Sequence, residues 1–345
     1  MTNSDLLFLK TLSEAFGPSG AEDEVRDLLF KEIRPFVDHV RVDGIGNLIA
    51  EKGDSNRLAI CAHMDEVGFM ITEIHNDGTL RFASVGGISP ASLPSKKVII
   101  GGKYHIPGVI GAKPIHLSKK DKKEITFSDL FIKFGASCKS EAEEIVSVGD
   151  FAVFDAKFSV SINNKAVFGK ALDNRIGCFL LKKLICSEKV QNATFVFTVQ
   201  EETGLRGAGT FADNNAFDIG IALDTTTAND LPDVDVPQSV CFLEKGPVIS
   251  YIDGATIYNR DFINNAFSRL NDNKITAQTK MRRAGGNDAS ALQKKGNGHQ
   301  VLSLSVPCRY IHGPLGVTTV FDIQESYQAL ELLAVDYSNK GENHD

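Results

Sequence analysis

The chain opens with two stretches whose apolar residues recur at helical spacing. A stripe from Leu6 to Phe16 predicts a helix over residues 5–16, because residues three or four apart share one face of a helix. The sequence GPSG at 17–20 ends this helix, since Gly and Pro break helices. A second helix is predicted over residues 21–33, with acids in its first turn, where the helix dipole favours negative charge. Strands are predicted next, at 39–42, 47–51 and 57–62.

The pattern changes between residues 69 and 155, where Gly and Pro separate short β-rich runs. This is typical of a small all-β module such as a barrel. From residue 169 onward, stretches with helical spacing of apolar residues alternate again with strand-like stretches. Helices are predicted at 174–185, 261–270, 289–294 and 322–335, and strands at 194–200, 218–223, 247–251, 275–280 and 300–305. We therefore predict an α/β fold in which residues 1–68 and 156–345 form one domain and residues 69–155 are inserted into it.

Composition narrows the class of protein. With 42% hydrophobic and 23% charged residues among 345, the chain has the ordinary composition of a globular protein. Its net charge of −7 argues against nucleic acid or a membrane surface as a partner. No apolar run approaches the ~20 residues of a spanning helix, and the first residues lack the pattern of a signal peptide. The six cysteines are scattered and none forms CxxC, so we expect buried thiols and a cytoplasmic protein.

Seven polar residues stand at the ends of predicted strands or directly before a predicted helix. They are His63, Asp65, Asp173, Glu201, Glu202, Asp224 and His312. In open α/β sheets, binding sites form where the carboxyl ends of the strands meet. The pattern therefore predicts that these side chains converge on one crevice.

The residue types indicate what the crevice would hold. Two histidines and three carboxylates match the nitrogen and oxygen ligands of Zn²⁺ and similar divalent ions. Two such ions about 3.5–4 Å apart, bridged by a shared carboxylate, can clamp a water and a polarised carbonyl. A further carboxylate would then take the proton of the attacking water. Taken singly, each residue has a plainer interpretation: Asp173 as a helix cap, Glu201 and Glu202 as a solvated strand end, and His312 as a packing residue.

Six longer motifs in a fixed order carry a resemblance. They are AHMDEVGFM, PGVIGAKPIHL, ALDNRIGC, QEETGLRGA, LDTTTAND and VPCRYIHGP. With them the chain resembles, over nearly its whole length, the M42 family of co-catalytic metallo-aminopeptidases, which includes glutamyl aminopeptidases and the tetrahedral (TET) peptidases.

The resemblance implies a role for each ligand. His63 and Asp224 would bind one metal ion, and Glu202 and His312 would bind the other. Asp173 would bridge the two ions. Zinc or cobalt are the ions we expect.

The resemblance also implies the reaction and the architecture. Glu201 would act as general base on a water that bridges the ions, and Asp65 would orient the imidazole of His63. The expected activity is the removal of N-terminal residues from peptides. The expected fold is a three-layer α/β/α peptidase domain interrupted by a small β-barrel-like domain that mediates dimer contacts. A homo-oligomer is expected, either a dimer or a dodecameric tetrahedral shell.

Two segments depart from the family pattern. The family usually has Ser-Pro and an acid after the residue matching His312, where this chain has Gly313 to Gly316, and it has Thr where this chain has Asn287. These departures leave the ligands intact and bear on side-chain preference and assembly. The basic cluster of Lys280, Arg282 and Arg283 either favours an acidic substrate side chain or is a solvated strand edge.

Three other functions remain open at this point. A metal-dependent deacylase of N-acylated amino acids or peptides would use the same ligands. A glycosidase would use Glu201 and Glu202 as its carboxylate pair, although adjacent residues of an extended strand point to opposite faces. A shell-forming or binding protein with a decayed site would need no intact ligand set.

Overall fold

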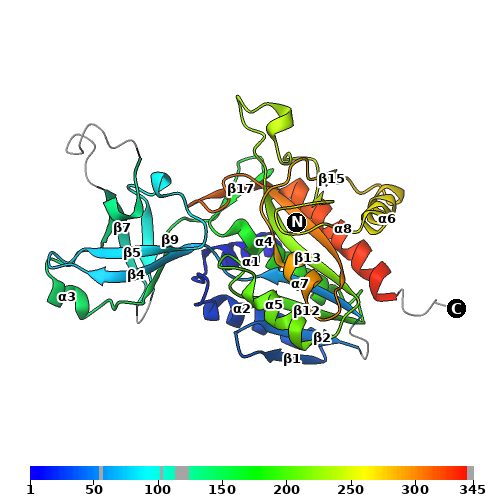
Figure 1. Ribbon diagram of the computed structural model, residues 1–345, viewed down its shortest axis with the longest axis horizontal. Helices are drawn as coiled ribbons and strands as arrows, with labels where there is room; N and C mark the ends of the chain where they lie inside the picture. Colours follow the sequence, from blue (N-terminus) through cyan, green and yellow to red (C-terminus); the bar gives the residue numbers. More distant parts are fainter. Residues whose placement is uncertain (54–56, 102–103, 113–123, 340–345) are drawn as a thin grey trace.

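The computed structural model describes residues 1–53, 57–101, 104–112 and 124–339 (Figure 1). The last five residues of the PGVIGAKPIHL motif lie outside the described residues. The molecule has two parts: a larger one that mixes helices and strands, and a β-rich one that projects to its side (Figure 1).

An eight-stranded sheet forms the centre of the larger part. Its strands are β1 (His39–Val42), β2 (Leu48–Lys52), β3 (Leu58–His63), β12 (Ala193–Thr198), β13 (Ile219–Thr227), β14 (Val248–Ile249), β15 (Gln278–Thr279) and β16 (Gln300–Cys308). Their order across the sheet is β1-β2-β12-β3-β13-β16-β14-β15. The four middle strands, β12, β3, β13 and β16, run parallel, so their carboxyl ends meet at one edge. Every residue of β3 and β12 is buried, as expected for parallel strands that are covered on both faces.

Helices cover both faces of this sheet. They are α1 (Asn3–Glu14), α2 (Asp23–Ile33), α4 (Leu172–Ser187), α5 (Arg206–Asn214), α6 (Arg260–Asp272), α7 (Asp288–Lys294) and α8 (Val320–Asn339). Helix α4 packs on the central strands together with α8, while α7 packs on them beside α5, on the other face (Figure 1). Within the described ranges, no helix is both long and apolar enough to cross a membrane.

The projecting part is a closed barrel with a core of its own. Its strands are β4 (Gly68–Ile74), β5 (Leu80–Val85), β6 (Lys97–Ile100), β7 (Ile106–Ala112), β8 (Leu130–Lys133) and β9 (Phe151–Phe154), and the short helix α3 (Lys139–Glu143) lies beside them. They close in the order β4-β5-β8-β7-β6-β9. Inside, the ring of Phe69 meets Phe82 and Phe154 edge to face, at 5.0 and 5.3 Å between ring centroids. The predicted α/β class with an inserted barrel is confirmed.

Several details differ from the prediction. Strand β13 continues through Asp224 to Thr227, because these polar residues still pair with β16 after β3 has ended. Strand β12 ends at Thr198, two residues earlier than expected. The sequence pattern missed β8 and a small antiparallel sheet of β10 (Ser159–Val160), β11 (Ala166–Gly169) and β17 (Gly316–Thr319). The expectation that all six thiols are buried is wrong, since Cys138 is exposed and Cys186 is half-buried.

Candidate metal centre

A cavity of about 420 Å³ lies at the carboxyl edge of the parallel strands. Six of the seven predicted side chains line it: His63, Asp173, Glu201, Glu202, Asp224 and His312. The seventh, Asp65, is fully buried next to His63. Side chains from β3, β13, α4 and two loops therefore meet although they are far apart in the sequence.

Asp173 lies between the two histidines. One of its carboxylate oxygens is 3.4 Å from Nε2 of His63, and the other is 3.4 Å from Nε2 of His312. Among the described residues, no group donates a hydrogen bond to the buried Oδ1 of Asp173. The sequence placed Asp173 before a helix; it lies in the first turn of α4, but its ψ of 103° is not helical. This local break accompanies the position of the carboxylate between the two rings.

Two further carboxylates complete the cluster around the imidazoles. Oδ1 of Asp224 lies 3.5 Å from Nε2 of His63, and Oε2 of Glu202 lies 3.3 Å from Nε2 of His312. Three groups of side chains each offer ligand atoms within 4.8 Å of one another. These groups are His63 with Asp173 and Asp224, His63 with Glu201 and Glu202, and Asp173 with Glu202 and His312.

Glu201 and Glu202 do not point to opposite faces of a strand. Strand β12 ends at Thr198, the chain turns, and both carboxylates come within 4.8 Å of the ring of His63. The expectation from the sequence is therefore wrong at this point, because it assumed that the extended conformation continues to Glu202. The distance between Glu201 and Glu202 therefore does not distinguish a metal site from the carboxylate pair of a glycosidase. The two histidines beside them favour the metal site.

Asp65 holds the neighbouring groups in place. Its Oδ1 accepts a hydrogen bond from the backbone N–H of Glu201, at 3.0 Å, and lies 3.4 Å from Nδ1 of His63. Its Oδ2 accepts from the N–H of Glu202, at 3.1 Å, and from the hydroxyl of Ser19, at 2.6 Å. One buried carboxylate thus contacts both a histidine and the segment that carries two acids.

His312 is oriented by the barrel segment. Its Nδ1 lies 3.0 Å from the carbonyl oxygen of Gly87, a residue between β5 and β6. Sequence reasoning missed Gly87, because a backbone carbonyl leaves no signal in residue type. The inserted part therefore contributes a contact to the site.

A buried ionic network beneath the site was also missed. Glu66 accepts from the ammonium of Lys170, at 2.6 Å, and from the guanidinium of Arg175, at 3.1 Å. Arg175 also donates to the carbonyl oxygens of Met64, at 2.8 Å, and Leu12, at 2.5 Å. The network joins α1, α4 and the loop after His63. Glu66 and Arg175 stand inside the AHMDEVGFM and ALDNRIGC motifs, and this position was the signal that could have pointed to them.

The crowding of acids changes how they titrate. Burial, together with the Asp173 carboxylate, raises the pKa of Glu202 to about 8. Burial also raises the pKa of Glu201 well above its usual range. Although burial acts against it, the carboxylates of Asp173 and Glu202 raise the pKa of His312 to about 9. These shifts indicate an excess of negative charge that cations would relieve.

The residues present fit divalent metal ions. The set offers imidazole nitrogens and carboxylate oxygens, which Zn²⁺ and Co²⁺ both accept. The buried Oδ1 of Asp173 accepts no hydrogen bond from the described residues and lies 3.4 Å from Nε2 of His63, so it adds an acceptor beside that imidazole. The ligand atoms of each group are close enough to share one ion.

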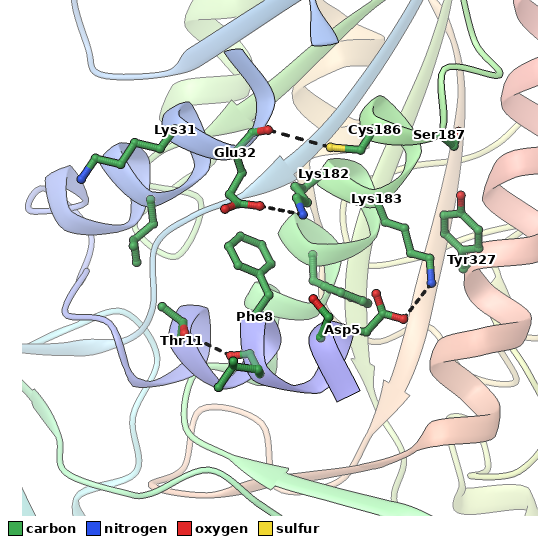
Figure 2. A pocket seen from close by; sticks show the side chains of 14 residues that line it. Asp5, Phe8, Thr11, Lys31, Glu32, Lys182, Lys183, Cys186, Ser187 and Tyr327 are labelled. Atoms are coloured by element: carbon green, nitrogen blue, oxygen red, sulfur yellow. Dashed lines mark hydrogen bonds and ion pairs between the residues drawn. The ribbon is translucent and has the colours of Figure 1, made fainter. Parts of the chain in front are cut away.

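A larger cleft lies elsewhere on the molecule. It measures about 610 Å³ and is lined by residues of α1, α2, α4 and α8. Figure 2 shows Lys182 directed toward Glu32 and Lys183 directed toward Asp5, with ion-pair distances of 2.8 and 3.1 Å. It shares no lining residue with the cavity at the strand ends.

The fold and the site together define a metal-dependent hydrolase of the α/β/α type. Residues 46–329 match the family described as M42 glutamyl aminopeptidase. The chain belongs to this family, whose members are aminopeptidases.

Curated relatives carry names from the same activity class. The chain is 36% identical to the putative aminopeptidase FrvX of Escherichia coli, over 93% of this chain and 91% of FrvX. It is 30% identical to the lysyl aminopeptidase of Pyrococcus furiosus, over 95% of this chain and 96% of that one. It is equally 30% identical to the glutamyl aminopeptidase of Lactococcus lactis, over 94% of this chain and 93% of that one.

Solved structures extend the likeness to the whole fold. A TET aminopeptidase from a thaumarchaeote has a TM-score of 0.93 at 31% identity and covers 98% of this chain and 99% of its own. The TET1 peptidase of Pyrococcus horikoshii, described as assembling into a tetrahedron or a large octahedral shell, has a TM-score of 0.85 at 38% identity over 96% of this chain and 99% of its own. A Thermotoga maritima protein named endoglucanase has a TM-score of 0.79 at 31% identity over 96% of this chain and 99% of its own.

Proposed function

We propose that the chain removes N-terminal residues from peptides with two divalent metal ions, zinc or cobalt, in the cavity at the strand ends. The observation that carries this proposal is the position of Asp173, with one oxygen 3.4 Å from each of two histidines. A carboxylate in that position suits a bridge between two ions. A structural site that surrounds a single ion with protein ligands does not need such a bridge, and neither does a glycosidase.

Five side chains would hold the ions. His63 and Asp224 would bind one ion, Glu202 and His312 the other, and Asp173 both. When bound, such ions lower the pKa of a water molecule and polarise the substrate carbonyl. Asp65 would keep His63 in place, because its backbone carbonyl oxygen lies 3.2 Å and its carboxylate 3.4 Å from Nδ1; outer residues fix the orientation of a metal-binding histidine in this way.

Glu201 would carry the proton. It lines the cavity, and Asp65 holds its backbone N–H. As the oxygen of water bonds to the peptide carbonyl carbon, Glu201 accepts the proton that leaves this water. As the carbon–nitrogen bond breaks, the same carboxyl group donates a proton to the departing amine. The products are a free amino acid and a peptide shorter by one residue.

We further propose that the enzyme prefers substrates whose first residue is acidic, because the ammonium of Lys280 would pair with that side chain. Lys280 is half-buried and lines the same cavity, and no side chain in the described part of the protein pairs with its ammonium. Arg283 donates to the carbonyl oxygens of Asp253 and Gly254, at 3.2 and 3.3 Å. Arg282 is exposed and does not line the cavity. Of the three basic residues, Lys280 is thus available to a substrate carboxylate.

A panel of aminoacyl-nitroanilides, measured in EDTA and after addition of Co²⁺ or Zn²⁺, tests the proposal. We expect cleavage only with metal, with Asp and Glu substrates fastest. In Lys280→Glu the preference should reverse toward Lys and Arg substrates, because the charge at this position changes sign. Arg282→Glu is the matched control and should keep the original order. Activity that survives EDTA would refute the metal mechanism.

N-acetyl amino acids and a glucan, added to this panel, separate the alternative functions. A deacylase would cleave N-acetyl amino acids and leave free aminoacyl substrates intact, while still requiring metal. A glycosidase that uses Glu201 and Glu202 would act on a glucan and remain active in EDTA. Hydrolysis of either substrate in place of aminoacyl-nitroanilides would replace the proposed function.

We also propose a role for the barrel. Residues 69–155 would form a separate domain that pairs two copies of the chain, and the dimers would build a larger shell. The support is the assembly described for the Pyrococcus horikoshii relative. Mass photometry distinguishes a monomer, a dimer and a dodecamer, and a monomeric protein would exclude this arrangement.

A further inference from the structure

The segment that carries Glu201 and Glu202 is held by side chains from other elements. Strand β12 ends at Thr198, and Gln200 adopts a positive φ of 55°. The backbone N–H groups of residues 199 to 202 do not donate to a neighbouring strand. Each of the four donates to a side-chain oxygen instead, at distances of 3.0 to 3.1 Å.

Three side chains supply these acceptors. Asn47 accepts from residue 199, Glu22 from residue 200, and Asp65 from residues 201 and 202. The role of Asp65 is explained by its contact with His63. Asn47 belongs to the β2 region and also donates to the carbonyl of Gly207. Glu22, by contrast, has no assigned role.

Glu22 has an unusual position for an acidic residue. It is the residue that precedes α2, where a side chain commonly caps the helix, yet it makes no capping hydrogen bond. Only 5% of it is exposed. Its Oε1 accepts from the N–H of Gly20, at 2.8 Å, and from the N–H of Gln200, at 3.1 Å. A buried carboxylate is costly unless it is hydrogen-bonded. Both donors reach the same oxygen, and they link the α2 loop to the turn after β12.

We propose that Glu22 is a positioning residue, whose carboxylate holds the N–H of Gln200 and thereby sets the direction in which Glu201 and Glu202 enter the cavity. The inference rests on the proposed function, because it assigns importance to Glu201 and Glu202. The next two N–H groups belong to Asp65, so Glu22 and Asp65 together fix three successive residues of the turn. If the N–H of Gln200 were released, this strained residue would relax and the carboxylate of Glu201 would be displaced.

Steady-state kinetics of three variants test this role. In Glu22→Ala, we expect kcat to fall by on the order of 10- to 100-fold, the effect of a misplaced reacting group, with KM changed less than about threefold. Glu22→Gln should retain most of the activity, because an amide oxygen accepts the same two hydrogen bonds. Glu24→Ala is the matched control: Glu24 lies in the same turn but is exposed, and its loss should leave kcat unchanged.

Hydrogen exchange gives a readout that is independent of activity. In Glu22→Ala, peptides that cover residues 199–203 should exchange faster than in the wild type, while peptides from α4 and β13 should not. A uniform increase across the protein would indicate a merely structural role and overturn the proposal. The proposal would also be overturned by wild-type kcat in Glu22→Ala, or by equal losses in the Ala and Gln variants.

Two further outcomes remain interpretable. If Glu22→Ala does not fold, Glu22→Asp replaces it; its carboxylate is one methylene shorter, so kcat should fall, and wild-type kcat would refute the inference. If the wild type cleaves no aminoacyl substrate with added metal, the proposed function fails. The exchange experiment then still decides whether Glu22 holds the turn.

Discussion

Two hollows of this protein differ in how their charges are arranged. In the cleft between α1, α2 and α4, each of Lys182 and Lys183 has an acid partner in the wall (Figure 2). In the cavity at the strand ends, four carboxylates surround two histidines, and burial raises the pKa of Glu202 to about 8. The cleft is the larger of the two, about 610 against 420 Å³. Volume is therefore a poor guide to the site.

The difference has a physical reason. Opposite charges at a surface satisfy one another and require no ligand, and such pairs contribute little to stability. Buried like charges repel and are costly to desolvate, so their convergence indicates a ligand of opposite charge. Perturbed pKa values in a cavity mark functional sites for the same reason.

Removing the shared carboxylate should have the largest effect. In Asp173→Asn, we expect both ions to bind more weakly and activity to fall to that of the metal-free protein, because an amide bridges two cations poorly. Metal content per chain after dialysis and activity on an aminoacyl-nitroanilide measure this. Asp213→Asn, an exposed acid paired with Lys295, serves as control. Retention of two ions by Asp173→Asn would contradict the bridge.

The next largest effect should come from the proton carrier. Glu201→Gln should lose about 10²–10⁴ of kcat, the usual contribution of a general base, while it keeps its metal. The neighbouring variant Glu202→Gln should lose metal as well as activity. Elemental analysis of the metal content, together with kinetics, distinguishes the two variants. Near-wild-type turnover in Glu201→Gln would show that another group takes the proton.

The metal-free protein should become less stable as pH rises. Glu202 has its pKa raised from 4.5 to about 8, and His312 from 6.5 to about 9. The folded state then binds more protons than the unfolded chain between these values, so the free energy of unfolding falls from about pH 5 to pH 9. Urea unfolding in EDTA measures it.

Two controls define this pH effect. Glu202→Gln should show a shallower decline, because one of the two groups is gone. Added Zn²⁺ should stabilise the protein most at the higher pH, since the ligands bind metal when deprotonated. A metal-free stability that is flat or rises over this range would contradict the crowding of charge at the site.

The smallest effect is expected in the cleft. Lys183→Met breaks the ion pair with Asp5, which is partly exposed, and should change the free energy of unfolding by about 0–1 kcal/mol. Activity on any aminoacyl-nitroanilide should not change. Thermal denaturation and the same kinetic assay check both statements. A clear loss of activity would mean that the comparison of the two hollows is wrong.

Much of the fold could be predicted from local patterns. The alternation of helix and strand periods predicted the α/β part, and the Gly- and Pro-rich interval predicted the barrel. The errors arose where a partner in space decides the outcome. Strand β13 extends through Asp224 because β16 continues beside it, and the chain turns after Thr198 because side chains of Asn47, Glu22 and Asp65 take its N–H groups.

The site was predictable in part for a similar reason. Residue types at predicted strand ends pointed to the seven polar side chains, since parallel strands end at a common edge. Glu22 and Gly87 could not be found in this way. Glu22 accepts a hydrogen bond from the backbone N–H of Gln200, and Gly87 contacts His312 through its own carbonyl oxygen. Neither contact depends on a recognisable spacing in the sequence.

By itself, the sequence determined which donor atoms exist and the order in which they follow one another, because these are covalent properties of the chain. Only the tertiary structure decided which of them meet. It directed the two oxygens of Asp173 to different histidines and brought Lys280 into the cavity apart from its basic neighbours. The physical reason is that convergence depends on how strands, helices and turns pack, which no short stretch of residues specifies alone.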